Sequence, residues 1–369
     1  IHGINNNHLY NIEQKIIGKK VEVKIDNNKP IYMNISNGKY IEHFNDTFFN
    51  MLYVEEQKRG FEPEENLIVP GRFEIELEPK EEKEISVICS LEDNIEELNA
   101  RAIITNEIAR LGLEINKSGL IDNKKTNKSI DEEKRDKLVR TFLIGTDNFI
   151  IRRPKFESYS IIAGYHWFLD WMRDTLISFE GLLLIPKRYE VAKKVLQTCV
   201  KDIRCGLVPN AYSESDDSPL YNSVDASLLL FEQVKKYIEY TNDYKFIYEE
   251  IYNHLEDIIE NYKNGIDLDD NNIYLDSDGL IVSGTEYTQN TWMDAKYAGV
   301  AVTPRNGKAV EINALWYNAL KIMEELSLKN ENKDKSKKYK KMATKCKNAF
   351  ESKFYNKRRK CLYDVLGDN

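Results

Sequence analysis

Apolar and charged side chains alternate through the first part of the chain, as they do in half-buried β-strands. This period-2 pattern occupies residues 21–25 and 73–77, and a further short apolar segment lies at 85–89. Asn-Asn, Asn-Gly and Pro-Gly pairs separate these segments and are typical of turns. Strands of this kind pack as an antiparallel sandwich layer. Residues 1–95 are therefore predicted to form a β-sandwich portion.

The period of the pattern changes at about residue 96, where apolar positions begin to repeat at helical spacing. In the segment 223–241, Val224, Leu228 and Phe231 share one face of the predicted helix. The pattern predicts helices over 96–112, 132–149, 174–186, 188–203, 223–241, 243–264, 310–328 and 333–354. A polar connector at 113–131 interrupts them, so we expect a helical linker over 96–131 and a helical domain over 132–369.

Successive helices with short connections pack as antiparallel pairs. A closed toroid of such pairs needs about a dozen helices, whereas seven are predicted after the linker. The predicted fold is mainly α, an incomplete α/α toroid of helical hairpins preceded by a β-sandwich portion. A smaller irregular bundle is the alternative. The chain begins with Ile1 and ends without a clear terminator, so we expect it to be part of a longer protein.

Composition excludes several classes of function. The net charge is −8, and no basic groove with interleaved aromatic residues is present, which argues against a nucleic-acid partner. No apolar stretch approaches the ~18 residues that a membrane span requires. The five cysteines are widely spaced and form no metal-binding pattern with histidine, so we expect free thiols in a reducing, cytoplasmic compartment. We predict neither a metal ion nor an organic cofactor.

Three polar and aromatic segments interrupt the helical pattern and contain three of the four tryptophans. They comprise 164–175, then 207–210 with 221–225, and finally 291–296 with 303–305 and 310–313. A pyranose stacks its apolar face on an aromatic ring and needs donors and acceptors for its hydroxyls. Arg173 and Asp174 supply a donor fork and a two-oxygen acceptor side by side. Hydrolysis of a glycosidic bond needs two further carboxyl groups, and the mixture of residues therefore favours sugar chemistry.

Most of these residues also have a purely structural interpretation. Asp174 is a candidate N-cap, residues 222–225 are a candidate capping arrangement with Asp225 in the first turn, and Glu311 complements a helix dipole. Asp294 is harder to explain in this way, because it lies between aromatic and small residues in a segment without clear helical phase. Core packing is the ordinary role of three tryptophans at helical spacing: Trp167, Trp171 and Trp316.

Taken together, the motifs resemble those of the glycogen-debranching amylo-α-1,6-glucosidase family. The segments that carry the resemblance keep the family's order and rough spacing, and they are 163–175, 206–210, 221–226, 291–296, 302–305 and 311–316. Residues 59–73 are similar to the end of the family's β-sandwich domain. The resemblance covers nearly the whole chain.

The resemblance implies a toroid of six helical hairpins, similar to that of glucoamylases. It also implies inverting hydrolysis of the single α-1,6-linked glucose at a branch stub, so the expected partner is a branched α-glucan such as glycogen or limit dextrin. Asp294 would be the general acid, with burial beside Trp292 helping it to hold its proton. Arg173 and Asp174 would hold the hydroxyls of the terminal glucose.

Five further residues are candidates for contacts with the sugar. Trp171, Trp292 and Tyr221 would stack around it, and Asp225 and Glu311 would add polar contacts. Two departures from the family pattern stand against this assignment. Met172 occupies a position where the family commonly has glycine, and we expect it to reshape that edge of the pocket.

The second departure is the general base, which in the family is a glutamate in a Gly-Pro-Glu-Trp-like segment. No such segment occurs in this sequence. We therefore expect an isolated chain to have little activity and the longer protein to be an enzyme. The alternatives are a glucoamylase-like or glucosyl-glycerate-type α-glycosidase on the same toroid, a non-catalytic carbohydrate-binding protein, and an unrelated helical protein.

Overall fold

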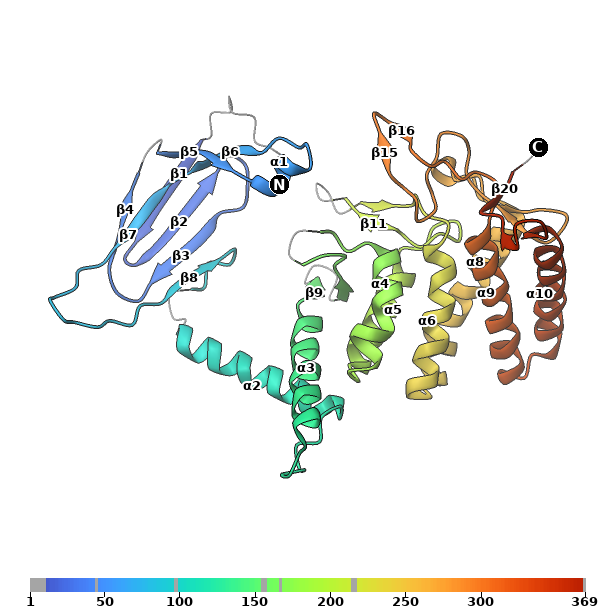
Figure 1. The fold of residues 1–369 in the computed structure, drawn as a ribbon, viewed down its shortest axis with the longest axis horizontal. Coiled ribbons are helices and arrows are strands. Elements are labelled where there is room, and N and C mark those ends of the chain that lie inside the picture. The colour runs from blue at the N-terminus through green and yellow to red at the C-terminus, as the bar shows by residue number, and fades with distance from the viewer. Residues whose placement is uncertain are drawn as a thin grey trace. The chain divides into compact units, whose positions relative to one another are not determined.

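The computed structural model describes residues 11–43, 46–95, 99–153, 158–165, 168–213 and 218–367 (Figure 1). The chain divides into two compact units, Ile1–Leu111 and Gly112–Asn369, and each is described by itself. The division falls inside helix α2 (Ala100–Ser118). The domain limits predicted at 95/96 and 131/132 stay predictions.

Unit 1 contains a four-stranded antiparallel sheet and two separate strand pairs. The sheet has the order β1-β2-β3-β8, with β1 (Ile12–Ile17), β2 (Lys20–Ile25), β3 (Ile31–Ile35) and β8 (Val87–Ser90). The pairs are β4 (Lys39–Glu42) with β7 (Gly71–Glu74), and β5 (Thr47–Leu52) with β6 (Glu64–Ile68), and α1 (Val54–Lys58) lies between β5 and β6. The predicted β module is confirmed, although β7 ends earlier than the predicted 73–77 segment.

Alternation along β2 explains the sheet's core. Val21 and Val23 are 0% and 2% exposed and share one face, while Glu22 between them remains half-buried on the other. In the register, Val21 lies opposite Met33 of β3. The period-2 pattern read from the sequence thus determines which face of the sheet is buried.

Unit 2 is built from helices that lie side by side (Figure 1). They are α3 (Ile130–Asp147), α4 (Met172–Phe179), α5 (Tyr189–Lys201), α6 (Ala226–Thr241), α7 (Tyr244–Phe246), α8 (Tyr252–Asn264), α9 (Val310–Lys329) and α10 (Lys333–Lys353). Two π-helical turns, η2 (Glu180–Leu184) and η3 (Ile247–Ile251), extend α4 and join α7 to α8. The predicted order, a β module followed by a mainly helical domain, is confirmed. None of the helices in the described ranges has the length and apolar character that a membrane span needs.

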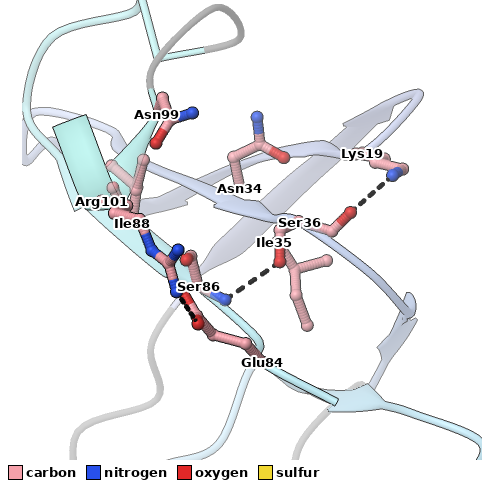
Figure 2. Close-up of a pocket in the computed structure, with 10 residues that line it drawn as sticks. Lys19, Asn34, Ile35, Ser36, Glu84, Ser86, Ile88, Asn99 and Arg101 are labelled. Atoms are coloured by element: carbon pink, nitrogen blue, oxygen red, sulfur yellow. Dashed lines mark hydrogen bonds and ion pairs between the residues drawn. The ribbon is translucent and has the colours of Figure 1, made fainter.

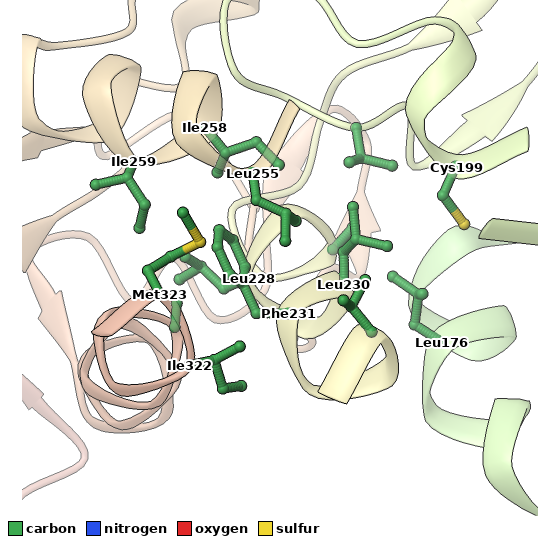
Figure 3. Close-up of a cluster of buried hydrophobic side chains, with 14 of the residues drawn as sticks. Leu176, Cys199, Leu228, Leu230, Phe231, Leu255, Ile258, Ile259, Ile322 and Met323 are labelled. Carbon is green, nitrogen blue, oxygen red and sulfur yellow. The ribbon is translucent and has the colours of Figure 1, made fainter. Parts of the chain in front are cut away.

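One hydrophobic core joins these helices. Figure 3 shows Leu176 of α4, Phe231 of α6 and Met323 of α9 among the side chains that fill it. Trp316 is fully buried in α9, and its ring stacks on Tyr262 of α8 with centroids 6.1 Å apart. The core interpretation is therefore right for Trp316. Trp167, and His166 beside it, lie outside the described residues.

Helix α2 is longer than predicted. The sequence predicted a helix ending at residue 112, because the polar connector at 113–131 has no clear periodicity, but the helix continues to Ser118. Ile115 in its last turns packs with Ile121 and Leu143 in a small separate cluster. Tertiary packing of one apolar residue therefore overrides a weak local signal.

Short strand pairs join the helices of unit 2. They are β9 (Ile150–Arg153) with β10 (Ser158–Ile161), β11 (Ala211–Tyr212) with β12 (Pro219–Leu220), β13 (Tyr274–Leu275) with β14 (Ile281–Val282), β15 (Lys296–Tyr297) with β16 (Val300–Ala301), β17 (Lys308–Ala309) with β20 (Val365–Leu366), and β18 (Tyr355–Asn356) with β19 (Cys361–Leu362). The β11–β12 pair precedes α6, and β17 of the β17–β20 pair leads directly into α9. In Figure 1, β11, β15, β16 and β20 lie at the same end of the helices. The three polar and aromatic segments lie in or beside these connections.

Candidate active site

The start of α4 is fixed by the segment 206–210. Trp171 is the N-cap residue in an extended conformation, and the backbone N–H of Met172 donates to the carbonyl of Asn210 at 2.7 Å. This bond satisfies one of the N–H groups that a helix start leaves without a partner. Arg173 and Asp174 consequently occupy the first turn of α4. The alternative in which Asp174 itself is the N-cap is wrong.

Arg173 brings two of the predicted acidic residues together. Its Nε donates to Oδ2 of Asp225 at 2.6 Å, and its Nη1 donates to Oδ2 of Asp294 at 2.7 Å. Its Nη2 donates to the carbonyl of Thr291 at 3.1 Å. Burial on its own would lower the pKa of Arg173, but the two carboxylates raise it overall. The guanidinium is therefore a fixed positive charge at the centre of the site.

Asp225, which accepts from Nε of Arg173, is buried and only 3% exposed. Its second oxygen, Oδ1, accepts a hydrogen bond from the hydroxyl of Ser223. That hydroxyl also accepts from the backbone N–H of Ala226 at 3.2 Å, in the first turn of α6. Asp225 is the N-cap residue of α6, but its side chain makes no capping hydrogen bond, so the predicted arrangement with Asp225 in the first turn is wrong. Both oxygens of Asp225 are bound by protein groups, and its contact with a sugar stays a prediction.

Asp294 lies in the loop before β15, and 36% of its side chain is exposed. Trp292, two residues earlier, is 55% exposed. The chain after Asp294 returns as the β15–β16 hairpin, whose turn has left-handed backbone at Ala298 and Gly299. The expected burial of Asp294 beside Trp292 is not found, because both side chains are exposed to solvent. Asp294 combines a fixed oxygen, held by Arg173, with access to solvent.

Asp174 is exposed beside this pair, and its pKa is raised. Partial burial of the carboxylate is the main cause, and the negative charges of Asp294 and Asp225 add to it, whereas Arg173 opposes the shift. In the described part of the chain the Asp174 carboxylate has no cation within ion-pair distance. Among Asp174, Asp225 and Asp294, the Asp174 carboxylate is therefore the one available to accept a hydrogen bond from a ligand.

The remaining aromatic candidates differ in access. Trp171 is half-buried at the start of α4. Tyr221 is only 6% exposed, its ring belongs to the core cluster, and its hydroxyl donates to the carbonyl of Asp202 at 2.7 Å. Met172, expected to reshape the pocket edge, is 2% exposed and has its sulfur 3.3 Å from that of Cys199. The side chain of Met172 points into the core. The stacking roles of Trp171, Trp292 and Tyr221 stay predictions.

Glu311 lies in the first turn of α9 and is engaged by Arg305. Both terminal nitrogens of Arg305 contact its carboxylate, with Nη2 2.7 Å from Oε2. Arg305 also holds Asp364, with Nε 2.9 Å from Oδ2 and Nη2 2.7 Å from Oδ1. The two carboxylates raise the pKa of Arg305 further above its already high value. A contact of Glu311 with sugar stays a prediction, because its oxygens are bound here.

Sequence reasoning gave no role to Arg305, Asp364 or Thr291. Arg305 and Thr291 carried a signal, since they belong to the motifs at 303–305 and 291–296. Asp364 carried none, because its contact with Arg305 joins residues 59 apart in the sequence. Arg305 also has left-handed backbone, with φ of 40°, which a side-chain-bearing residue adopts only when its surroundings impose it.

A cleft of about 550 Å³ in unit 1 lacks the features expected of a sugar-binding site (Figure 2). Lys19 donates to the carbonyl of Ser36 at 2.7 Å, and Arg101 pairs with Glu84. None of the described residues that line the cleft is aromatic. A sugar ring would find no stacking surface there, and the charged side chains already have partners.

The cysteines and the acidic residues show no metal centre among the described residues. No group of three or more His, Cys, Asp or Glu side chains is arranged to hold an ion there. All five cysteines are free, and Cys199 and Cys346 are buried. Burial raises the pKa of both thiols to about 12, so they are protonated at neutral pH.

Comparison with known proteins gives matches along most of the chain. Residues 144–369 match the family model described as amylo-alpha-1,6-glucosidase, and residues 1–84 match the model described as glycogen debranching enzyme N terminal. The glycogen debranching enzyme of Saccharomyces cerevisiae is 28% identical over 210 residues, which cover 43% of this chain and 14% of the yeast protein. The matched region is therefore a small part of that relative's length.

Two solved structures show a weaker likeness. A metal-independent α-mannosidase of Streptococcus pneumoniae, in a non-productive complex with α-1,6-mannobiose, gives a TM-score of 0.44 at 11% identity, covering 73% of this chain and 68% of the other. A bacterial glucoamylase complexed with acarbose gives 0.45 at 11% identity, covering 95% and 49% respectively.

Proposed function

The chain belongs to the amylo-alpha-1,6-glucosidase family, and from this premise we propose that its protein removes α-1,6-linked glucose from the branch stubs of glycogen or related α-glucans. The observation that carries the proposal is the convergence of Arg173, Asp225 and Asp294, where the loop that carries Asp294 also carries the exposed Trp292. Hydrolysis of a glycoside requires a carboxylic acid and a carboxylate base, and the ordered, half-exposed Asp294 is a candidate for the acid. An exposed aromatic face is typical of a sugar-binding site.

In the proposed mechanism Asp294 is the general acid of an inverting hydrolysis. Its Oδ2 accepts from Arg173, so we assign the transferable proton to Oδ1. That proton passes to the glycosidic oxygen as the bond to the anomeric carbon breaks. A second carboxylate must activate water on the opposite face of the sugar, with the two carboxyl groups about 6.5–9.5 Å apart. The family resemblance places that base in a Gly-Pro-Glu-Trp-like segment, so only the acid is assigned within this sequence.

Arg173 and Asp174 divide the work of holding the terminal glucose. A guanidinium has five N–H groups, and Arg173 uses three of its nitrogens on Asp225, Asp294 and Thr291. Its other N–H groups can donate to a sugar hydroxyl. Asp174, which is exposed, accepts from a neighbouring hydroxyl, and Trp292 supplies the stacking face.

The complete protein is proposed to form the six-hairpin toroid of the family and to act in the cytoplasm. The free cysteines are in keeping with a reducing compartment.

The test is glucose release from a branched limit dextrin beside linear maltooligosaccharides, using the longest form of the protein that contains this chain. Asp294→Asn is the test variant, and Asp334→Asn, at an exposed position in the first turn of α10, is the control. Release from the branched substrate that only Asp294→Asn abolishes supports the proposal. Release mainly from the linear substrate would move the assignment to a glucoamylase-like enzyme. Binding of the dextrin without release from either substrate would favour a carbohydrate-binding protein.

A further inference from the structure

Thr291 is held by two buried arginines at once. Its carbonyl oxygen accepts from Nη2 of Arg173 at 3.1 Å, and its hydroxyl oxygen accepts from Nη1 of Arg305 at 3.2 Å. The residue itself is 1% exposed. These two arginines otherwise have separate carboxylate partners, so Thr291 is the residue through which the two ion-pair clusters meet.

The Arg305 side of this link rests on a rigid frame. Glu311 belongs to the first turn of α9, and Asp364 directly precedes β20, which pairs with β17. The carbonyl of Asp364 also accepts from the backbone N–H of Val310 at 2.9 Å, at the start of α9. Arg305 is therefore fixed by a helix start and by a strand pair, independently of Arg173.

The Arg173 side leads to the proposed acid. Asp294 follows Thr291 by three residues, and both contact the same guanidinium, Thr291 through its backbone and Asp294 through its side chain. A change in the position of Thr291 would move one of the groups that aim this guanidinium and would move the start of the loop that carries Asp294.

We propose that Thr291 and Arg305 are positioning residues for Asp294, which hold the 291–294 loop so that the acid lies correctly against Arg173. The inference rests on the proposed role of Asp294 as the acid. It gives Glu311 and Asp364 a role in orienting Arg305. The physical basis is the steep dependence of catalysis on alignment, since a displacement of about 1 Å can lower a rate about 100-fold.

The kinetic test compares Thr291→Val, which removes the hydroxyl at constant shape, with Thr291→Ser, which keeps it. We expect Thr291→Val to lower kcat on the branched substrate by about 10- to 100-fold with little change in KM. Thr291→Ser is expected to retain most of the activity. Thr198→Val is the matched control, because the hydroxyl of Thr198 is also buried but bonds only backbone carbonyls of α5 and β10.

A second readout does not depend on activity. Fluorine NMR of protein labelled with fluorotryptophan reports on each tryptophan, and Trp292→Phe identifies the resonance of Trp292. We expect Thr291→Val and Arg305→Lys to shift or broaden that resonance and to leave the resonance of the buried Trp316 in place. Arg305→Lys keeps the positive charge but loses the fork that reaches both Glu311 and Thr291. It also serves if Thr291→Val does not fold.

The two proposals fail in different ways. An unchanged Trp292 resonance with unchanged kcat in Thr291→Val overturns the positioning role, while the loss of activity in Asp294→Asn still stands for the function. Conversely, a shifted Trp292 resonance with full activity in Asp294→Asn refutes the acid and leaves a purely structural link between the arginines.

Discussion

Arg173 and Asp294 are 121 residues apart in the sequence, yet Nη1 of the arginine lies 2.7 Å from Oδ2 of the aspartate. The same guanidinium reaches Asp225 at the start of α6. One buried cation thus connects α4, α6 and the loop before β15. The geometry of the candidate site therefore depends on a charge that is itself mostly hidden from solvent.

Arg173→Met is expected to destabilise the fold by about 3–5 kcal/mol, because it leaves the carboxylate of Asp225 buried without its cation. Urea denaturation measures the loss. The double variant Arg173→Met/Asp225→Asn is expected to recover part of it, since the uncompensated buried charge is then gone. If the double variant loses the full sum of the two single losses, the pair is not coupled and this account of Asp225 is wrong.

Asp294→Asn and Asp225→Asn are expected to separate activity from stability. Asp294 is half-exposed, so its amide variant should keep its melting temperature within about 2 °C while glucose release falls about 100- to 10,000-fold. Asp225→Asn should lower the melting temperature more than Asp294→Asn does, because the carboxylate of Asp225 is buried between Arg173 and Ser223. Thermal denaturation and initial rates measured on the same preparations make the comparison. Equal stability losses in the two variants would contradict it.

The elements of unit 2 were predictable because their signals are local. Helix α9 was predicted over 310–328 and spans Val310–Lys329, and α10 was predicted over 333–354 and spans Lys333–Lys353. Their apolar positions repeat at helical spacing over many turns, which is a strong signal. The run of α2 beyond residue 112 was missed because a contact of Ile115 with a distant residue sustains it.

The site was predictable only in part. The family resemblance predicted that Arg173, Asp225 and Asp294 belong to one site. No rule of sequence spacing could show that the arginine contacts both carboxylates. The role of Thr291 was missed because this residue acts partly through its backbone. The role of Asp364 was missed because the pairing of β17 with β20 brings its carboxylate to Arg305 from a distant part of the chain. Contacts of this kind, between segments distant in the sequence, cannot be predicted from local patterns.

Gly206→Ala is expected to cost about 1–3 kcal/mol of stability. Gly206 has φ of +75°, and an added Cβ would lie 2.5 Å from Cβ of Asn261 in α8. The strain would fall on the segment that ends at Asn210, whose carbonyl holds the start of α4, so activity should fall as well. Gly181→Ala is the control, because Gly181 has open space around it. Equal denaturation midpoints for the two variants would show that the close approach to Asn261 relaxes without cost.

Asp174→Asn is expected to stabilise the protein at neutral pH while lowering its activity. The folded protein raises the pKa of Asp174 above the ordinary 3.8, so the native state binds this proton more tightly than the unfolded chain does. Stability at this position is therefore lost as pH rises from about 3.8 through the raised value, and the loss is constant above it. The amide variant carries no such loss.

The gain in Asp174→Asn should be a few tenths of a kcal/mol, or about 1 °C in melting temperature, because water screens a carboxylate that is partly exposed. It should vanish below pH 3.8, where the aspartate is protonated in both states. Asp334→Asn removes a first-turn carboxylate from α10, as Asp174→Asn does from α4, so loss of the dipole interaction is common to both variants. The gain in Asp174→Asn comes from the partial burial of that carboxylate and from the charges of Asp294 and Asp225, so Asp334→Asn should show no gain at neutral pH. Melting curves from pH 3 to pH 8 and glucose release on the branched substrate test both halves. A residue whose removal stabilises the fold but abolishes turnover is held there for function, whereas a variant that loses stability at neutral pH would show that Asp174 has a structural partner.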